Sequence, residues 1–181
     1  MNLYFRLLLL MLRNLLPSRR LGPFDTSRLD SRVWPTDIDL NLHMNNGRYL
    51  GLMDLGRFDL MQRLGLVSKS LKERWMPVVA DVKIRYRFPL KPFQSFELHT
   101  RLVGWDRKWF YLEQRFIHRG RVMARALVRA AIVGKGRTLN CDEVMAVLGV
   151  TMSSPEVEEE FQTGWVTRQG TKPLPPLEEM V

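Results

Sequence analysis

Residues 37–49 read DIDLNLHMNNGRY and carry more chemical information than any other stretch of the chain. Within residues 37–46, polar positions alternate with Ile38, Leu40, Leu42 and Met44, and a run with helical spacing follows. The polar positions supply two carboxylates, an imidazole and three carboxamides. Buried polar groups each need a hydrogen-bond partner, so a packed core rarely contains this density of them. The stretch therefore indicates a functional site at the start of a helix.

Hydrophobic periodicity defines the elements on either side of this stretch. We expect a first strand at 28–36, and a largely enclosed helix at 46–64 that Asn45 or Asn46 would cap. From Pro77 onward the apolar period changes from helical to two. The pattern predicts strands at 77–88, 93–104, 108–118 and 121–134, a loop or short helix at 65–76, and a short helix at 140–148. One enclosed helix against a curved antiparallel sheet is an α+β arrangement.

The first 20 residues form a hydrophobic and basic unit. Its uninterrupted apolar run, residues 7–12, is shorter than the roughly 20 residues that a membrane-spanning helix needs. One interpretation is a helix that lies in a membrane interface, with Arg19 and Arg20 near anionic headgroups. The other is a helix docked on its own domain or on a partner subunit. A cleaved signal peptide is less favoured, because no basic segment precedes the apolar run and no small-residue cleavage site follows.

The remaining organisation follows from composition. We expect a main domain at 24–150 and a tail at 151–181 that is rich in Ser, Pro and Glu. The single Cys141 cannot form an internal disulfide and fits a reducing compartment, so a cytoplasmic location is expected, with peripheral contact at the inner face of a membrane as a further possibility.

The charge and the motifs limit the function classes. A net charge of +9 and a pI near 10.2 predict affinity for anions, but no zinc-finger, RNP or basic-zipper pattern points to nucleic acid. Three His and one Cys are too few for a structural zinc site. No dinucleotide or P-loop motif is present either, so we expect no metal and no cofactor.

The element order and residues 37–49 together resemble the hotdog-fold thioesterases. In the 4-hydroxybenzoyl-CoA thioesterase-like branch, a strand leads into D-x-D-x-x-G-[HV]-V-N-N-x-x-Y and then into the central helix. The matching positions here are Asp37, Asp39, His43, Asn45, Asn46 and Tyr49. Leu42 stands where that family often has Gly, and Asp54 stands where many members carry an acid on the helix. The likeness covers roughly residues 28–134, and the hydrophobic N-terminus also resembles a membrane-associated subgroup.

The resemblance implies a hotdog fold, in which a curved antiparallel sheet wraps a long central helix, and hydrolysis of a thioester. Asp39 matches the catalytic carboxylate of the family and would act as general base or nucleophile, because an ordinary Asp is ionised at neutral pH. His43 would hold a water or relay a proton, or else bond loop backbone. Asn41 would position substrate or water, a role that similarity to the plant acyl-carrier-protein thioesterases supports. Asp37 would orient its neighbours or fix the loop.

The start of the helix would supply the electrophilic half of the site. Unpaired N–H groups near residues 45–47 can polarise a thioester carbonyl. We therefore place Asn45, Asn46, Gly47 and Tyr49 on the substrate-binding side, with Asn45 as a helix cap and with Asn46 and Tyr49 in mainly structural roles. Asp54 lies either near a functional cleft or in an ion pair with Arg57.

Three functional hypotheses follow. The first is a thioesterase acting on acyl-CoA or on acyl groups carried by acyl carrier protein. The second is a non-catalytic hotdog protein that binds acyl groups or lipid at a membrane surface, and the third and weakest is a dehydratase or hydratase. The resemblance also implies a homodimer or a dimer of dimers with a shared site. Lys69, Lys72 and Arg74 could contact the phosphates of coenzyme A.

Overall fold

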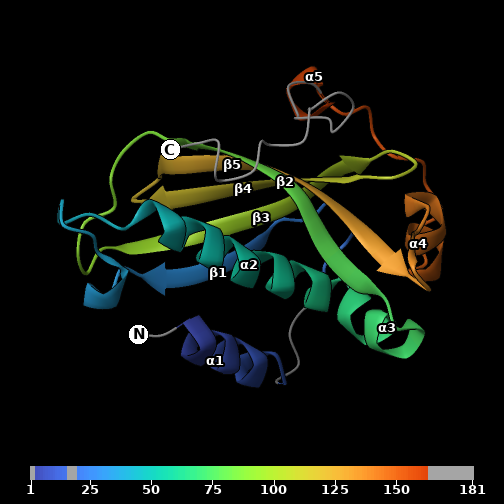
Figure 1. Ribbon diagram of the computed structural model, residues 1–181, viewed down its shortest axis with the longest axis horizontal. Coiled ribbons are helices and arrows are strands. Elements are labelled where there is room, and N and C mark those ends of the chain that lie inside the picture. Colours follow the sequence, from blue (N-terminus) through green and yellow to red (C-terminus); the bar gives the residue numbers. More distant parts are fainter. Residues whose placement is uncertain (1–2, 16–19, 163–181) are drawn as a thin grey trace, which may run out of the picture.

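A long helix, α2 (Asn46–Arg63), lies across one face of a curved antiparallel sheet (Figure 1). The computed structural model of the chain describes residues 3–15 and 20–162. The strands stand in the order β1-β3-β4-β5-β2, and the short β6 pairs with β5. Their bounds are β1 (Ser27–Arg32), β2 (Met76–Tyr86), β3 (Ser95–Trp105), β4 (Phe110–His118), β5 (Arg121–Gly134) and β6 (Arg137–Thr138). This arrangement confirms the expected hotdog fold.

Five shorter helices complete the described chain. They are α1 (Leu3–Leu15), the 3-10 turn η1 (Pro35–Asp37), α3 (Leu66–Glu73), α4 (Cys141–Val147) and α5 (Glu159–Gln162). The first strand ends four residues before the predicted position, because Pro35 opens η1. Residues 65–76, expected as a loop or short helix, contain α3. The periodicity gave no indication of α5 or β6.

Close contact between α2 and the sheet depends on Gly56. A Cβ placed on Gly56 would lie 2.6 Å from Thr100 Oγ1, 2.8 Å from Leu98 Cδ2 and 2.9 Å from Gln114 Nε2. The amide of Gln114 is fully buried and donates to Met53 O at 3.0 Å and to Thr100 Oγ1 at 2.9 Å. These bonds join the helix backbone to β3 and β4, so α2 has a fixed height above the sheet.

Helix α1 packs on α2 and keeps a second face in solvent (Figure 1). Arg6 and Leu10 are buried, and Leu3 and Leu7 pack against the main core. On the opposite side, large apolar side chains are about half exposed, namely Phe5, Leu8, Leu9, Met11 and Leu12. Within residues 3–15 and 20–162, no helix combines the length and the apolar character that crossing a bilayer requires. The buried contacts of α1 place it on its own domain, and its outward face remains apolar.

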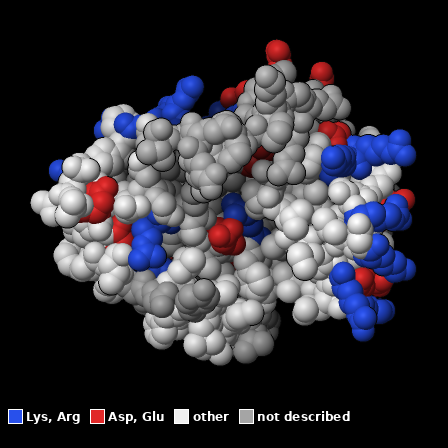
Figure 2. All heavy atoms as spheres, in the orientation of Figure 1, with Lys and Arg blue, Asp and Glu red and all other residues white. Residues whose placement is uncertain are grey.

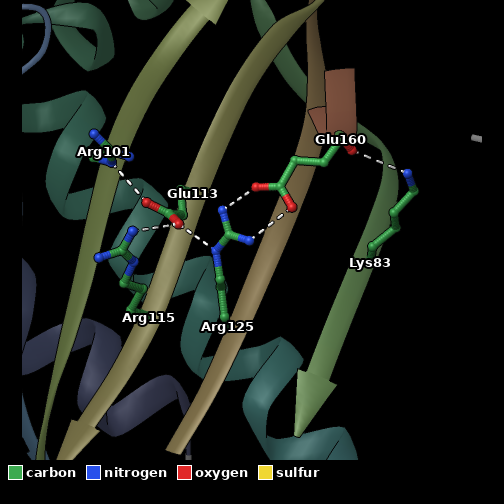
Figure 3. A network of polar contacts seen from close by, with 6 residues as sticks. All are labelled: Lys83, Arg101, Glu113, Arg115, Arg125 and Glu160. Carbon is green, nitrogen blue, oxygen red and sulfur yellow. Dashed lines mark hydrogen bonds and ion pairs between the residues drawn. The ribbon is translucent and has the colours of Figure 1, made fainter. Parts of the chain in front are cut away.

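The outer face of the sheet, opposite α2, carries a transverse row of basic residues. The strand registers place one member on each of the five main strands: Arg28, His99, Arg115, Arg125 and Arg85. Like charges on facing strand positions repel, so such a row needs anions beside it. Glu113 and Glu160 supply them (Figure 3).

Glu113 is the centre of this network. Its carboxylate is 1% exposed and accepts hydrogen bonds from Arg101 Nε at 2.8 Å, Arg115 Nη2 at 2.8 Å and Arg125 Nε at 2.5 Å. Burial alone would raise the pKa of Glu113, but these three guanidinium hydrogen bonds outweigh burial and hold the pKa below its ordinary value of 4.5. The carboxylate is therefore charged in the folded protein over the whole neutral range.

Replacing Glu113 by Gln is expected to reduce the free energy of unfolding by about 2 kcal/mol at pH 7, because three arginines lose one shared anion. A lowered folded-state pKa means that the contribution is present above pH 4.5 and is lost as the pH falls through the folded-state value. Urea unfolding of wild type and variant should therefore differ at pH 7 and converge near pH 3. The half-exposed Glu97, changed to Gln, is the control and should stay within about 0.5 kcal/mol. A Glu113→Gln difference independent of pH would contradict this account.

The beginning of the tail lies on the same outer face. Val157 and Phe161 are buried with Tyr111 and Leu127 in a small second cluster, and Arg125 binds the Glu160 carboxylate through both terminal nitrogens. The tail expected at 151–181 is thus packed on the sheet through Val157 and Phe161, and residues 163–181 lie outside the described residues.

Candidate active site

Residues 38–44 form a tight loop that leads into the start of α2. An isolated antiparallel bridge joins Ile38 to Met44. Inside it, Asp39 N donates to His43 O at 2.9 Å, and Asp39 Oδ1 accepts from Asn41 N at 2.9 Å and His43 N at 3.5 Å. The loop therefore brings the Asp39 carboxylate close to the backbone of Asn41 and His43.

The carboxylate of Asp39 is held by backbone and not by a cation. Among the described residues, no Lys, Arg or His forms an ion pair with it, and the His43 ring makes no hydrogen bond. The two side chains are partly exposed. A carboxylate held in this way can accept a proton from water or attack an electrophile.

The loop closes through Leu42, which adopts a φ of 58°. This is the left-handed region, where a Cβ meets the following carbonyl oxygen and glycine is favoured. Leu42 thus adopts a backbone conformation that glycine would adopt without strain. Its side chain is 70% exposed.

Replacing Leu42 by Gly is expected to raise the free energy of unfolding by about 0.5–1 kcal/mol, because the gain from relieved strain exceeds the entropy that glycine adds to the unfolded chain. Chemical denaturation measures this difference. Leu40, fully exposed two positions earlier and without a positive φ, is the matched control, and Leu40→Gly should not stabilise the protein. Equal effects at the two positions would show that the φ of Leu42 carries no strain.

The start of α2 lies directly after this loop. Asn45 is the N-cap, and its side chain accepts from Gly47 N at 2.8 Å, as expected for a helix cap. Arg48 N donates to Asn45 O at 2.8 Å. Of these first amides of the helix, the Asn46 N–H has no acceptor among the described residues. It is therefore the donor that a bound carbonyl oxygen could use, and the helix dipole points the same way.

Asp37 lies on the inner side of the loop, away from the free carboxylate of Asp39. It is 2% exposed and forms a buried ion pair with Arg6 of α1. Asp37 Oδ2 also accepts from Trp34 N at 2.9 Å, and Asp37 O accepts from Asn45 N at 2.8 Å. These contacts fix η1 to the helix cap, which is the loop-fixing role considered for Asp37.

Tyr49 also lies inside the protein. Its ring packs edge-on against Tyr86 and Phe116 at 5.0 and 4.8 Å between centroids. Burial raises the pKa of the Tyr49 hydroxyl to about 12, so it stays protonated. Tyr49 holds α2 on the sheet, in agreement with its expected structural role. Asn46 is tied to the sheet through its carbonyl, which accepts from Tyr86 Oη at 3.2 Å.

A cavity of about 410 Å³ runs along the second half of α2, beneath α1 and toward α4. Its lining is apolar except for Asp54 and Arg57, which pair with each other. Arg57 Nη1 donates to the buried Gln114 Oε1 at 2.8 Å, so the guanidinium is held at the wall. Asp54 is thus both at a cleft and in the ion pair that its spacing suggested. None of residues 37–49 is among the described residues that line this cavity.

The motif loop and the cavity therefore lie along the same helix: the loop precedes the start of α2, and the cavity is lined by its second half. Asp54 follows Asn46 by eight residues, a rise of about 12 Å along α2. Sequence reasoning placed Asp54 near a cleft or in an ion pair with Arg57, but it did not anticipate the other residues that line the cavity or Arg6 as the partner of Asp37. A charged residue inside an otherwise apolar run was the available signal for Arg6, but it fitted a membrane interface equally well.

Comparisons with known proteins agree with this geometry. Residues 33–175 match the family described as the thioesterase-like superfamily. The protein THEM6 of Danio rerio is 38% identical over 133 residues, which are 72% of this chain and 64% of that one. A probable thioesterase of Saccharomyces cerevisiae, YBR096W, is 32% identical over 121 residues, 64% of this chain and 51% of the yeast protein. The chain thus spans half to two thirds of the length of these two relatives.

Among solved structures, the probable thioesterase YbaW of Escherichia coli superposes with a TM-score of 0.64 at 21% identity. The match covers 98% of the bacterial chain and 69% of this one, so nearly a third of this chain has no counterpart there.

Proposed function

The chain belongs to the thioesterase-like superfamily, and from this premise we propose that it hydrolyses an acyl thioester, carried by coenzyme A or by acyl carrier protein. The observation that carries the proposal is the Asp39 carboxylate, which has backbone donors but no cationic partner among the described residues. Its loop leads to the start of α2, where the Asn46 N–H has no acceptor within the same part of the chain. One group supplies a base or nucleophile and the other an oxyanion donor. Family membership and the word thioesterase in the name of the yeast relative support the same reaction.

The reaction divides between these groups as follows. Asp39 removes a proton from a water whose oxygen attacks the thioester carbon, and the carbonyl oxygen becomes an oxyanion. The Asn46 N–H and the positive end of α2 stabilise that charge. The carbon–sulfur bond then breaks, and the proton passes to the departing thiolate, with His43 placed across the loop to hold the water or carry this proton. Asp39 acting as nucleophile would form an anhydride that water then opens.

The acyl group has an apolar place to go. The 410 Å³ cavity is large enough for a ligand of drug size, and its apolar lining favours a hydrocarbon chain. If the acyl chain carries a polar group, Arg57 and Asp54 are the polar side chains in the cavity wall that could bind it.

Release of free thiol from a panel of acyl-CoA and acyl-carrier-protein substrates tests the proposal. We expect thiol release that depends on chain length, with stoichiometric free acid. No release from any member of the panel would refute hydrolysis. The alternative, a non-catalytic acyl-binding protein, is supported by the cavity alone, and it predicts saturable binding of acyl-CoA without thiol release.

A second copy of the chain would complete the site. Among the described strands, β2 is an edge of the sheet with one side unpaired, and Met76 and Val79 on it are exposed together with Leu40 and Leu42 of the loop. Edge pairing of β2 with its symmetry mate would cover Met76 and Val79. Light scattering should give about twice the chain mass of 21.3 kDa, and Val79→Pro should give the monomer mass.

Contact with a membrane is the second part of the proposal. The outward side chains of α1 form an apolar face suited to a lipid interface. Full-length protein should float with anionic vesicles, and Leu8→Asp with Leu12→Asp, both on the outward face, should abolish flotation. Flotation unchanged by these substitutions would refute the contact.

Lys69, Lys72 and Arg74 lie on α3 or at its end, beyond the far end of α2. Helix α2 has 18 residues, so its length places this cluster about 27 Å from the Asp39 loop of the same chain. Figure 2 shows Lys and Arg gathered at the end of the molecule where α3 and α4 lie. We propose that this cluster binds the phosphates of a coenzyme A whose thioester lies at the Asp39 loop of a second copy. The Asp39 loop of the same chain is too far away to hold that thioester.

A further inference from the structure

We infer that α1 is a working part of the proposed site: Arg6 is a positioning residue that holds the Asp39 loop in place, and Leu3 and Leu7 form part of the wall of the acyl cavity. The inference rests on the proposed thioester hydrolysis for its kinetic test. Its structural content stands on contacts between α1 and two separate parts of the fold, the motif loop and the cavity.

The first contact is the buried Arg6–Asp37 pair. Arg6 is 7% exposed, and its Nη2 donates to Asp37 and, at 3.4 Å, to Arg32 O at the end of β1. The next cation, Arg48, is 3.8 Å from Asp37 and its side chain is 41% exposed. Removing Arg6 would leave the buried carboxylate with the Trp34 N–H and, as its nearest cation, the distant Arg48. A buried charge that loses its close counter-ion forces its surroundings to rearrange.

Asp37 passes this restraint to the reacting groups. Its carbonyl accepts from Asn45 N, and Asn45 caps the helix whose first free amide is the oxyanion donor. Asp39 follows Asp37 by two residues, so the backbone that Asp37 holds also carries the reacting carboxylate. Arg6 therefore sets the position of both the carboxylate and the helix start, although it touches neither.

The second contact is with the cavity. Leu3 and Leu7 both line it, and Gly51 of α2 leaves room for the Leu3 side chain. A Cβ on Gly51 would lie 3.2 Å from Leu3 Cδ2. The same helix thus closes the acyl cavity with one pair of side chains and restrains the motif loop with another. Anything that binds the outward face of α1 acts on a helix that is built into the site.

Arg6→Met and Arg6→Lys test the positioning role, with the exposed Arg28→Met on β1 as the matched control. With a short acyl-CoA in the absence of lipid, we expect Arg6→Met to lower kcat about 10- to 100-fold with little change in KM, because a misplaced carboxylate loses near-attack geometry. Arg6→Lys should recover part of the loss by restoring the charge. Wild-type kcat in Arg6→Met would overturn the inference.

Leu7→Ala and Leu8→Ala test the wall, since they remove the same atoms from the inner and outer faces of one helix. We expect Leu7→Ala to change KM severalfold for long acyl chains and not for short ones, and Leu8→Ala to change neither. If the two variants behaved identically, the inference that α1 forms part of the cavity wall would be wrong.

Hydrogen exchange separates this inference from the proposed reaction. In Arg6→Met, the amides of Asn41 and Asn45 should exchange faster than in Arg28→Met, while amides in the centre of β4 stay equally protected. If wild type releases no thiol but these amides respond, the reaction is refuted and the role of Arg6 in holding the loop stands. If the amides do not respond, the positioning role fails whatever the activity.

Discussion

Replacing Asp39 by Asn is expected to lower kcat for thioester hydrolysis by about 10²- to 10⁴-fold, the range that a positioned general base contributes. The substitution removes the charge but keeps Oδ1, which accepts from Asn41 N and His43 N, so the loop should keep its shape. Thiol release under saturating substrate measures the effect. The loss should appear in kcat, because the carboxylate acts on the reacting water and not on the acyl chain.

Asp30→Asn is the matched control for this experiment. Asp30 is an exposed carboxylate on β1, outside the motif loop, and its replacement should leave kcat within about twofold. Thermal unfolding of both variants should show stability close to wild type. If Asp39→Asn hydrolysed every substrate as fast as wild type, Asp39 would be neither base nor nucleophile.

Replacing Gly56 by Ala is expected to reduce the free energy of unfolding by about 3 kcal/mol. The new methyl would come within 2.6–2.9 Å of three buried side chains, and relief requires breaking the bonds of Gln114 to Thr100 and Met53 O. Overpacking and lost buried hydrogen bonds together exceed the gain of about 1 kcal/mol that Ala brings to a helix. Urea unfolding monitored by Trp fluorescence measures the change.

Gly51→Ala provides the comparison within the same helix. Its Cβ would meet Leu3 Cδ2 at 3.2 Å, the tip of a flexible side chain that can shift by a few tenths of an ångström. Helix propensity should offset this contact, giving a change within about 1 kcal/mol. Equal destabilisation at both positions would mean that loss of helical glycine, and not close contact with the sheet, controls the effect.

The fold was predictable because the spacing of apolar residues within each segment indicates whether that segment is a helix or a strand. The alternation on β2 to β5 and the apolar surface of α2 define one sheet and one enclosed helix, and the Asn45 cap marks the helix start. The same locality explains why the loop could be predicted: Asp39, Asn41 and His43 meet through hydrogen bonds that span at most four residues.

Contacts between distant segments were not predictable in this way. Arg6 and Asp37 are 31 residues apart, and only the docking of α1 brings them together. Arg57 and Gln114 are 57 residues apart and meet because Gly56 lowers α2 onto the sheet. The cavity depends on side chains from several elements at once, and no single segment of the sequence encodes it.

The positions of α1 and α5 also limit stoichiometry. Helix α1 packs on α2 on the helical side of the protomer. Helix α5 packs, through Phe161, on the outer face of the sheet. Copies that stacked on the bare surface of α2 or on the outer face of the sheet beneath Phe161 would have to displace a segment of their own chain. Pairing at the β2 edge requires no such displacement, and a twofold axis uses that edge once and closes. We therefore expect contact through the β2 edge to join two subunits.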